Sequence, residues 1–163
     1  SSAASDVYKR QSLQIIKTKP GSKLVSAFFV MCVQNKELGA DGVFVMGDCG
    51  LNQNPNPVQL ADIAASSAES FEYLVGEKAR VAMLSHSTHG SAAHPDVDKV
   101  VEATKIAQKE YPQFLIDGEL QTDAAVVPEV AALCRQHKDA LSQEIQKDVP
   151  RNHKGFRQSA YDR

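Results

Sequence analysis

The stretch Arg80 to Ser91 reads RVAMLSHSTHGS, and it gives the clearest indication of the fold of this chain. Its first residues, RVAML, form a short apolar run of the kind that a buried strand has. A loop of Ser, His, Thr and Gly follows, and Pro95 then begins a helix that ends at Tyr111-Pro112. A strand, a polar loop and a helix in this order make the repeating unit of an α/β sheet.

The same alternation continues on both sides of this unit. Asn56 followed by Pro57 is typical of a helix start, and Gly76 is a typical helix end. Residues 123–133 (DAAVVPEVAAL) are apolar enough for a buried helix, in which Pro128 makes a kink or a restart. Strands are expected at 24–33, 43–46, 80–84 and 114–116. We therefore predict the order β-β-α-β-α-β-α in a three-layer α/β fold, with a mainly parallel sheet and right-handed crossovers.

Length and composition allow one ordinary domain and argue against several classes of partner. The chain has 163 residues, and its formal net charge of -2 gives no reason to expect nucleic acid or an anionic membrane. No stretch approaches the ~18 apolar residues of a spanning helix, and no secretory leader is recognisable, so we expect a cytoplasmic protein. The cysteines are widely spaced and lack a Cys-x-x-Cys pair, so neither a disulfide framework nor a zinc site is predicted.

The two ends of the sequence look unrelated to its middle. Residues 1–11 (SSAASDVYKRQ) show no hydrophobic periodicity and resemble the translation of a sequencing-library adapter, so we leave them out of the fold. Residues 134–163 turn polar, with seven basic residues against four acidic ones. We therefore expect an internal fragment in which residues 12–133 form a partial α/β domain and residues 134–163 form a non-matching tail.

The loop after the strand at 80–84 carries hydroxyl groups and a glycine, at Ser85, Ser87, Thr88, Gly90 and Ser91. Neutral donors and free backbone N–H groups at the carboxyl end of a strand suit an oxyanion such as phosphate. The alternative is that Ser and Thr only make turn hydrogen bonds between the strand and the helix. The spacing alone leaves both interpretations open.

Histidines and aspartates lie in and after this loop, at His86, His89, His94, Asp96 and Asp98. Imidazole and carboxylate are ordinary metal ligands. The histidines nevertheless lack the i, i+4 spacing of a helical zinc pair, and loop histidines are often simply solvated. No metal site is therefore predicted.

Two further polar motifs also follow apolar runs. Asp117 and Glu119 straddle Gly118, and alternation in an extended segment would direct both carboxylates to one side, as acid/base chemistry would need. Their alternative role is structural, in accepting backbone N–H bonds and capping the next helix. Asp48 and Asn52 follow the strand at 43–46, where such residues often fix a turn. No Gly-x-Ser-x-Gly, Walker A or Gly-x-Gly-x-x-Gly motif is present.

Several motifs in order carry a resemblance to one family. They are IKTKPG from Ile16, GVFVMGDCGLNQNPNPVQLADIA from Gly42, RVAMLSHSTHGS from Arg80, DVDKVVEATKIA from Asp96 and IDGELQTDAAVVPEVAAL from Ile116. Across residues 13–133 the chain resembles phosphate acetyltransferase (phosphotransacetylase). The resemblance implies reversible transfer of an acetyl group between acetyl phosphate and coenzyme A, without a metal and without a covalent acyl-enzyme.

The resemblance also implies an architecture and a set of partners. Two α/β domains would flank the active cleft, similar to isocitrate and isopropylmalate dehydrogenases, and the parent would be a homodimer. The partners would be the substrates acetyl phosphate and coenzyme A, with no further cofactor, no nucleic acid and no membrane. The motif positions imply that Ser85, Ser87, Thr88, Gly90 and Ser91 line the phosphate side of the cleft. By the same resemblance, its floor is shaped by Asp117, Gly118, Glu119 and Gln121.

The chain departs from the family pattern after Leu133. A Ser-Arg pair followed by an Asp, which the resemblance implicates in catalysis, is absent there, and so are the coenzyme-binding arginines upstream. Catalytic residues are therefore not assigned, and the fragment alone is expected to be inactive. Phosphate butyryltransferase and the phosphotransacetylase-like regulatory domain of a malic enzyme stay open as alternatives. The run from Thr88 to Ser91 and Gln121 favour the free-standing acetyltransferase.

Overall fold

The structure is a computed structural model that describes residues 11, 14–15, 17, 24–134 and 136. The expected segment 1–11 and the expected tail 134–163 thus lie outside the described residues, apart from Gln11, Cys134 and Gln136. In the described part, no helix is both long enough and apolar enough to cross a membrane.

The first two strands form an antiparallel hairpin. Strand β1 (Phe28–Cys32) pairs with β2 (Val43–Gly47), so that Phe28 lies opposite Gly47 and Cys32 opposite Val43. This pair thus departs from the mainly parallel sheet that the sequence predicts, and residues 24–27 of the expected strand 24–33 are not part of β1. The physical reason is the connection, because residues 33–42 are too short a link for the crossover that parallel strands need.

The hairpin connection turns sharply at a glycine. Gly39 has a φ of +61°, in the left-handed region that glycine tolerates best. A Cβ atom at this position would also lie 2.6 Å from the carbonyl oxygen of Val43. Glycine is therefore required here by both the backbone conformation and the available space.

The second pair of strands is parallel, as expected. Strand β3 (Arg80–Leu84) pairs with β4 (Leu115–Leu120), and helix α3 (Pro95–Glu110) connects them. Strand β4 extends beyond the expected 114–116 through the motif Asp117-Gly118-Glu119. The pairing with β3 supplies backbone hydrogen bonds that outweigh the low strand propensity of Asp and Gly.

The helices begin and end close to the expected positions. Helix α2 (Pro57–Val75) starts with a capping box in which Asn56 and Gln59 exchange hydrogen bonds, and it ends at Gly76 in the left-handed conformation. Helix α4 (Thr122–Val126) stops at Val127, and the chain is helical again over residues 128–134. The restart at Pro128, one of the two expected possibilities, is confirmed.

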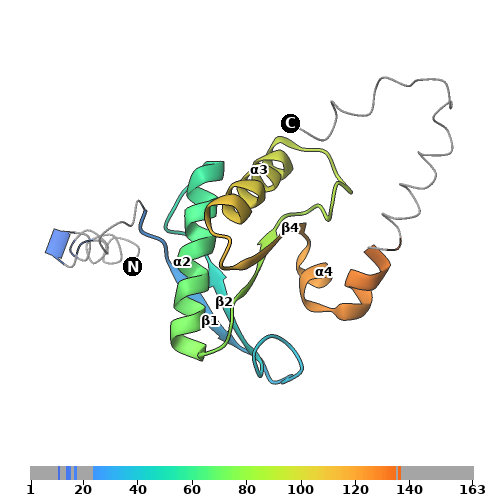
Figure 1. The fold of residues 1–163 in the computed structure, drawn as a ribbon, viewed down its shortest axis with the longest axis horizontal. Helices are drawn as coiled ribbons and strands as arrows, with labels where there is room; N and C mark the ends of the chain where they lie inside the picture. The colour runs from blue at the N-terminus through green and yellow to red at the C-terminus, as the bar shows by residue number, and fades with distance from the viewer. Residues whose placement is uncertain (1–10, 12–13, 16, 18–23, 135, 137–163) are drawn as a thin grey trace.

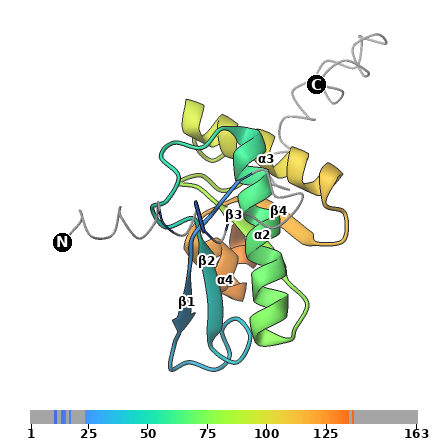
Figure 2. The ribbon, with the colours of Figure 1, turned by 90° about the vertical axis from the view of Figure 1, so that its left-hand side faces the viewer.

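The core lies between α2, α3 and the β3–β4 pair. Small side chains let these elements approach closely: Ala61 and Ala68 of α2 are 0% and 1% exposed, and Ala103 and Ala107 of α3 are both 0% exposed. Figures 1 and 2 show α2 beside the hairpin and α3 beside β4. Leu74, near the end of α2, is 54% exposed and lies outside this core.

The described residues therefore form a mixed α/β arrangement with two small sheets. The α/β class and the order of elements are confirmed. The single, mainly parallel sheet is not what these residues form, because one strand pair is antiparallel and the two pairs are not joined to each other.

Candidate functional site

The hydroxyl-rich loop 85–91 lies directly against the end of β4. The backbone N–H of Ser85 donates to the carbonyl oxygen of Leu120 at 2.9 Å, and the N–H of His89 donates to that of Glu119 at 3.1 Å. The two motifs belong to neighbouring parallel strands, whose carboxyl ends meet at one edge of a sheet. The structure thus brings together the two groups of site residues that the sequence suggested.

Glu119 is the centre of this contact. Its side chain is 3% exposed, and its Oε1 accepts hydrogen bonds from the Ser87 hydroxyl at 3.1 Å and from the Gly90 N–H at 2.6 Å. A buried carboxylate needs such donors, because burial without hydrogen bonds is costly. Glu119 therefore occupies donors of the loop that were candidates for binding an external anion.

The hydroxyl groups of Ser87 and Thr88 are also used inside the protein. Ser87 is 0% exposed, and its Oγ accepts from the Ala92 N–H at 3.2 Å. Thr88 Oγ1 accepts from the Gln121 N–H at 2.9 Å and donates to Gln121 Oε1 at 3.3 Å. These bonds are of the kind expected if Ser and Thr serve to fix the loop and not to bind a ligand. They hold loop 85–91 to the start of α4.

The opposite side of the loop faces solvent. His86, Gly90 and Ser91 are exposed, and Ser85 is half-buried. Ser91 Oγ accepts from the Thr88 N–H at 2.9 Å, so its side chain is held in place while it stays accessible. A ligand approaching the loop would meet these residues before it met Ser87 or Thr88.

Asp117 and Glu119 have different surroundings. Asp117 is exposed and accepts from the neighbouring Gly118 N–H at 2.8 Å, whereas Glu119 is buried. In the strand register Gly118 lies opposite Met83 and Leu120 lies opposite Leu84, so Glu119 is the extra residue of a bulge. The regular alternation expected through this segment is therefore wrong, because a bulge interrupts it.

Gly118 makes this close approach possible. Its φ is +156°, and a Cβ atom there would lie 2.6 Å from the Cβ of Met83 and 2.8 Å from the Met83 carbonyl oxygen. A side chain at this position would thus push β4 away from β3. The glycine lets the bulge form, and the bulge brings Glu119 to the loop.

The third motif forms a tight turn after β2, as expected. Asp48 Oδ1 accepts from the N–H groups of Gly50 at 3.0 Å and Leu51 at 2.9 Å, and Oδ2 accepts from the N–H of Asn52 at 3.2 Å. The Asn52 side-chain amide donates to Asp48 as well, and to the carbonyl oxygen of Val25 at 2.9 Å. The prediction that Asp48 and Asn52 fix a turn is confirmed.

These hydrogen bonds change the acidity of Asp48. Burial of the carboxyl group acts to raise its pKa, but the N–H donors of Leu51, Gly50 and Asn52 favour the charged form and together outweigh burial. The net effect is a pKa lowered from the ordinary value of 3.8.

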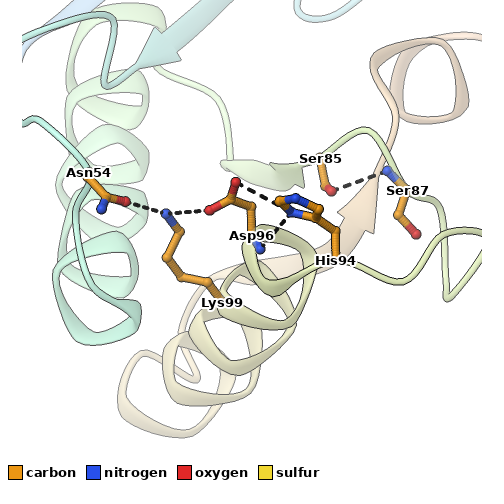
Figure 3. A network of polar contacts seen from close by, with 6 residues as sticks. All are labelled: Asn54, Ser85, Ser87, His94, Asp96 and Lys99. Carbon is orange, nitrogen blue, oxygen red and sulfur yellow. Dashed lines mark hydrogen bonds and ion pairs between the residues drawn. The ribbon is translucent and has the colours of Figure 1, made fainter.

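Of the histidines near the loop, His94 takes a structural position. His94 caps α3, because its Nδ1 accepts from the Asp96 N–H at 3.1 Å, and it lies 3.5 Å from the Asp96 carboxylate. Lys99 Nζ lies 3.4 Å from Asp96 and donates to Asn54 Oδ1 at 2.8 Å (Figure 3). Among the described side chains, no three His, Cys, Asp or Glu residues gather as a possible metal-ligand set.

Sequence reasoning missed two of these contacts. The position before Pro95 is a helix-cap position, so the role of His94 had a local signal. The link from Lys99 to Asn54 joins residues far apart in sequence and had none. It ties the loop after β2 to the start of α3 (Figure 3).

Comparison with known proteins connects this arrangement to one family. The family described as phosphate acetyl/butaryl transferase matches residues 2–140, and so extends beyond residues 12–133 at both ends. The phosphate acetyltransferase of Acetivibrio thermocellus is 57% identical over 122 residues, which are 75% of this chain and 37% of that protein. The phosphate acetyltransferase of Escherichia coli K12 is 50% identical over 122 residues, 75% of this chain and 16% of that protein.

Solved structures agree with this assignment. A phosphotransacetylase from Streptococcus pyogenes superposes with a TM-score of 0.66 at 44% identity, covering 76% of this chain and 36% of that chain. The EutD phosphotransacetylase from Staphylococcus aureus gives a TM-score of 0.65 at 44% identity, over 75% of this chain and 36% of that one. The chain therefore belongs to the phosphate acetyl/butaryl transferase family, and it spans about two fifths or less of the relatives it matches.

Proposed function

We propose that the protein represented by this chain transfers an acetyl group reversibly between acetyl phosphate and coenzyme A. The observation that carries the proposal is the junction of loop 85–91 with the end of β4, in a chain 57% identical to a phosphate acetyltransferase over this region. The substrates are then acetyl phosphate and coenzyme A, and no further cofactor is required.

The residues of this junction fall into two groups, one accessible to a ligand and one held by internal hydrogen bonds. Ser85, Gly90 and Ser91 lie on the accessible side and are the better candidates for contact with the phosphate of the substrate. Ser87, Thr88, Glu119 and Gln121 are cross-linked and act as positioning residues that keep the loop in shape. In this reaction the coenzyme A thiolate attacks the acetyl carbonyl, and a fixed loop stabilises the departing phosphate.

The finer architecture is part of the same proposal. We propose a three-layer fold like that of isocitrate and isopropylmalate dehydrogenases, completed by residues outside the described part. We also propose a homodimeric, cytoplasmic parent protein. The 163-residue chain alone is expected to be inactive, since it spans 37% of the Acetivibrio relative.

The two alternative functions have less support. The family description includes butyryl transfer, but the relatives reported above are named phosphate acetyltransferases. A regulatory domain of a malic enzyme finds no support among these names. Acetyl phosphate is therefore the substrate to test first.

A chimeric enzyme tests the proposal. Residues 24–134 of this chain replace the matching part of the Acetivibrio phosphate acetyltransferase. Formation of acetyl-coenzyme A from acetyl phosphate is then compared with formation of butyryl-coenzyme A from butyryl phosphate. Faster turnover of acetyl phosphate supports the proposal. A folded chimera that uses butyryl phosphate better, or neither substrate, contradicts it. Ser91→Ala in the chimera should raise KM for acetyl phosphate, whereas Asp41→Asn, far from the loop in sequence and exposed, should not.

A further inference from the structure

Two polar loops follow strands that belong to different sheets. Loop 48–55 follows β2 and leads to α2, and residues 85–94 connect β3 to α3. Among the described residues, β2 and β3 do not pair with each other, so no backbone ladder in this part of the chain fixes one loop relative to the other. The packing of α2 against α3 and the contacts of individual side chains therefore set how the two loops lie.

Lys99, near the start of α3, connects loop 48–55 to the first turn of that helix. Its Nζ donates to Asn54 Oδ1 at 2.8 Å and lies 3.4 Å from Asp96 Oδ1 (Figure 3). The Lys99 side chain is only 24% exposed. A lysine ammonium group carries three N–H donors, so one group can hold both oxygen atoms. Loop 48–55 and α3 are thus joined at this ammonium group.

Asn54 holds its end of the contact in an uncommon backbone conformation. Its φ is +45°, in the left-handed region, where asparagine is one of the few residues other than glycine to be found. Such a conformation persists where the surrounding structure holds it. The rest of the loop is folded around Asp48, whose carboxylate accepts from three backbone N–H groups of the loop. Fixing Asn54 therefore fixes a loop that is already ordered internally.

The contacts continue from Asp96 to loop 85–91. His94 Nδ1 accepts from the Asp96 N–H and lies 3.5 Å from the Asp96 carboxylate. The His94 ring packs edge-on against the ring of His86, with the centroids 5.6 Å apart and an angle of 73° between the ring planes. His86 belongs to loop 85–91. The contacts between the two loops therefore run through five residues: Asn54, Lys99, Asp96, His94 and His86.

We propose that Lys99 is a positioning residue for acetyl transfer, which holds loop 48–55 and loop 85–91 at the separation that acetyl phosphate requires. The inference rests on the proposed function, in which loop 85–91 contacts the phosphate. Lys99 acts through the loops, because its ammonium group is already committed to Asn54 and Asp96. Without Lys99, the loops hold the binding arrangement for only a fraction of the time. The apparent affinity for the substrate falls by that fraction.

A direct contact between Lys99 and the substrate phosphate is the competing role. Asn54 distinguishes the two roles, because removing its side chain breaks the contact with the loop and leaves the charge of Lys99 in place. Asn54→Gly suits this purpose, since glycine tolerates a φ of +45° and only the side-chain amide is lost.

Steady-state kinetics of the chimera described above test the proposal. Lys99→Met and Asn54→Gly should each raise KM for acetyl phosphate at least about fivefold and change kcat less than about twofold, because saturating substrate restores the binding arrangement. The double variant should be no worse than Lys99→Met alone, since that change already removes the contact. Lys105→Met, at an exposed lysine of the same helix, should leave KM unchanged.

Three kinetic results would overturn the proposal. An unchanged KM in Lys99→Met would mean that the loops do not need this contact. A raised KM in Lys99→Met together with an ordinary KM in Asn54→Gly would assign Lys99 to the substrate itself. A lower kcat with an unchanged KM would indicate less folded enzyme, which is what a merely structural contact predicts.

Amide hydrogen exchange of the 163-residue chain separates failure of this inference from failure of the proposed function. We expect the N–H groups of Gly50, Leu51 and Asn52 to exchange at least about threefold faster in Lys99→Met and in Asn54→Gly than in the unsubstituted chain. Lys105→Met should leave these rates unchanged. If the unsubstituted chimera uses neither substrate, the proposed function fails, and the exchange rates alone decide whether Lys99 holds the loop. Unchanged exchange in Lys99→Met contradicts the inference whatever the chimera does.

Discussion

The backbone N–H of Gly90 and the Oε1 of Glu119 lie 2.6 Å apart, which joins the loop after β3 to the bulge in β4. The same carboxylate oxygen accepts from the buried Ser87 hydroxyl. Loop 85–91 is thus folded around a carboxylate of the protein itself. This relationship makes the loop's shape depend on a residue about thirty positions away.

Removing that carboxylate should destabilise the chain. Glu119→Ala leaves the Ser87 hydroxyl and the Gly90 N–H without their acceptor, and an unsatisfied buried donor costs about 1–3 kcal/mol. We expect urea unfolding to show a loss in this range. The control is Asp117→Asn, at an exposed carboxylate two positions away, which should change the free energy of unfolding by less than about 0.5 kcal/mol. Equal losses of unfolding free energy in the two variants would mean that the buried contacts of Glu119 add no more stability than an exposed carboxylate does.

The hydroxyl of Thr88 should matter more than its methyl group. Thr88→Val removes both hydrogen bonds with Gln121 and is expected to cost about 1–3 kcal/mol in the free energy of unfolding. Thr88→Ser keeps the hydroxyl and should retain most of the stability. If the serine variant proved as unstable as the valine variant, packing of the methyl group would be the cause.

Asp48 should make stability depend on pH in the acid range. Its pKa is lower in the folded chain than the ordinary 3.8, so its contribution is complete above 3.8 and is lost as pH falls through the folded value. Asp48→Asn should lower stability by about 1 kcal/mol at neutral pH, and the gap to the unsubstituted chain should close in acid. Chemical unfolding of both chains at a series of pH values measures this difference in the free energy of unfolding.

The matched control for Asp48 is Asp41. Its side chain is 80% exposed in an ion pair with Lys36, at 3.7 Å, and such pairs contribute little. The free energy of unfolding of Asp41→Asn should therefore differ little from that of the unsubstituted chain at every pH. A gap for Asp48→Asn that stays constant down to strongly acidic pH would contradict the proposed role of the carboxylate charge.

Tyr111 should titrate at unusually high pH. A hydrogen bond from its hydroxyl to Asp62 Oδ1, at 2.5 Å, is the main cause that raises the pKa of Tyr111 to about 12, and burial adds to it. The stability that it contributes is complete below pH 10 and is lost as pH rises through about 12. Tyr111→Phe should remove the highest tyrosine transition in an ultraviolet titration, whereas Tyr73→Phe, at a side chain 88% exposed, should leave it in place. Persistence of that transition in Tyr111→Phe would refute the assignment.

Features encoded within a few residues were predictable from the sequence. The capping box of Asn56 and Gln59, the end of α2 at Gly76, the restart at Pro128 and the Asp48 turn all depend on hydrogen bonds and backbone angles inside one short segment. The resemblance to the family rested on similar short motifs, and the comparisons bear it out. Local chemistry is visible in a sequence because its partners are neighbours there.

The order of elements, the α/β class and the family could thus be predicted from the sequence. Three features appear only in the folded chain: β1 and β2 are antiparallel, Glu119 is buried while Asp117 is exposed, and Lys99 contacts Asn54. Each of these depends on which distant segments pack together, and on a bulge whose position the pairing of β3 with β4 sets. Strand pairing is chosen by the packing of whole elements, so the same residues in another register would point elsewhere.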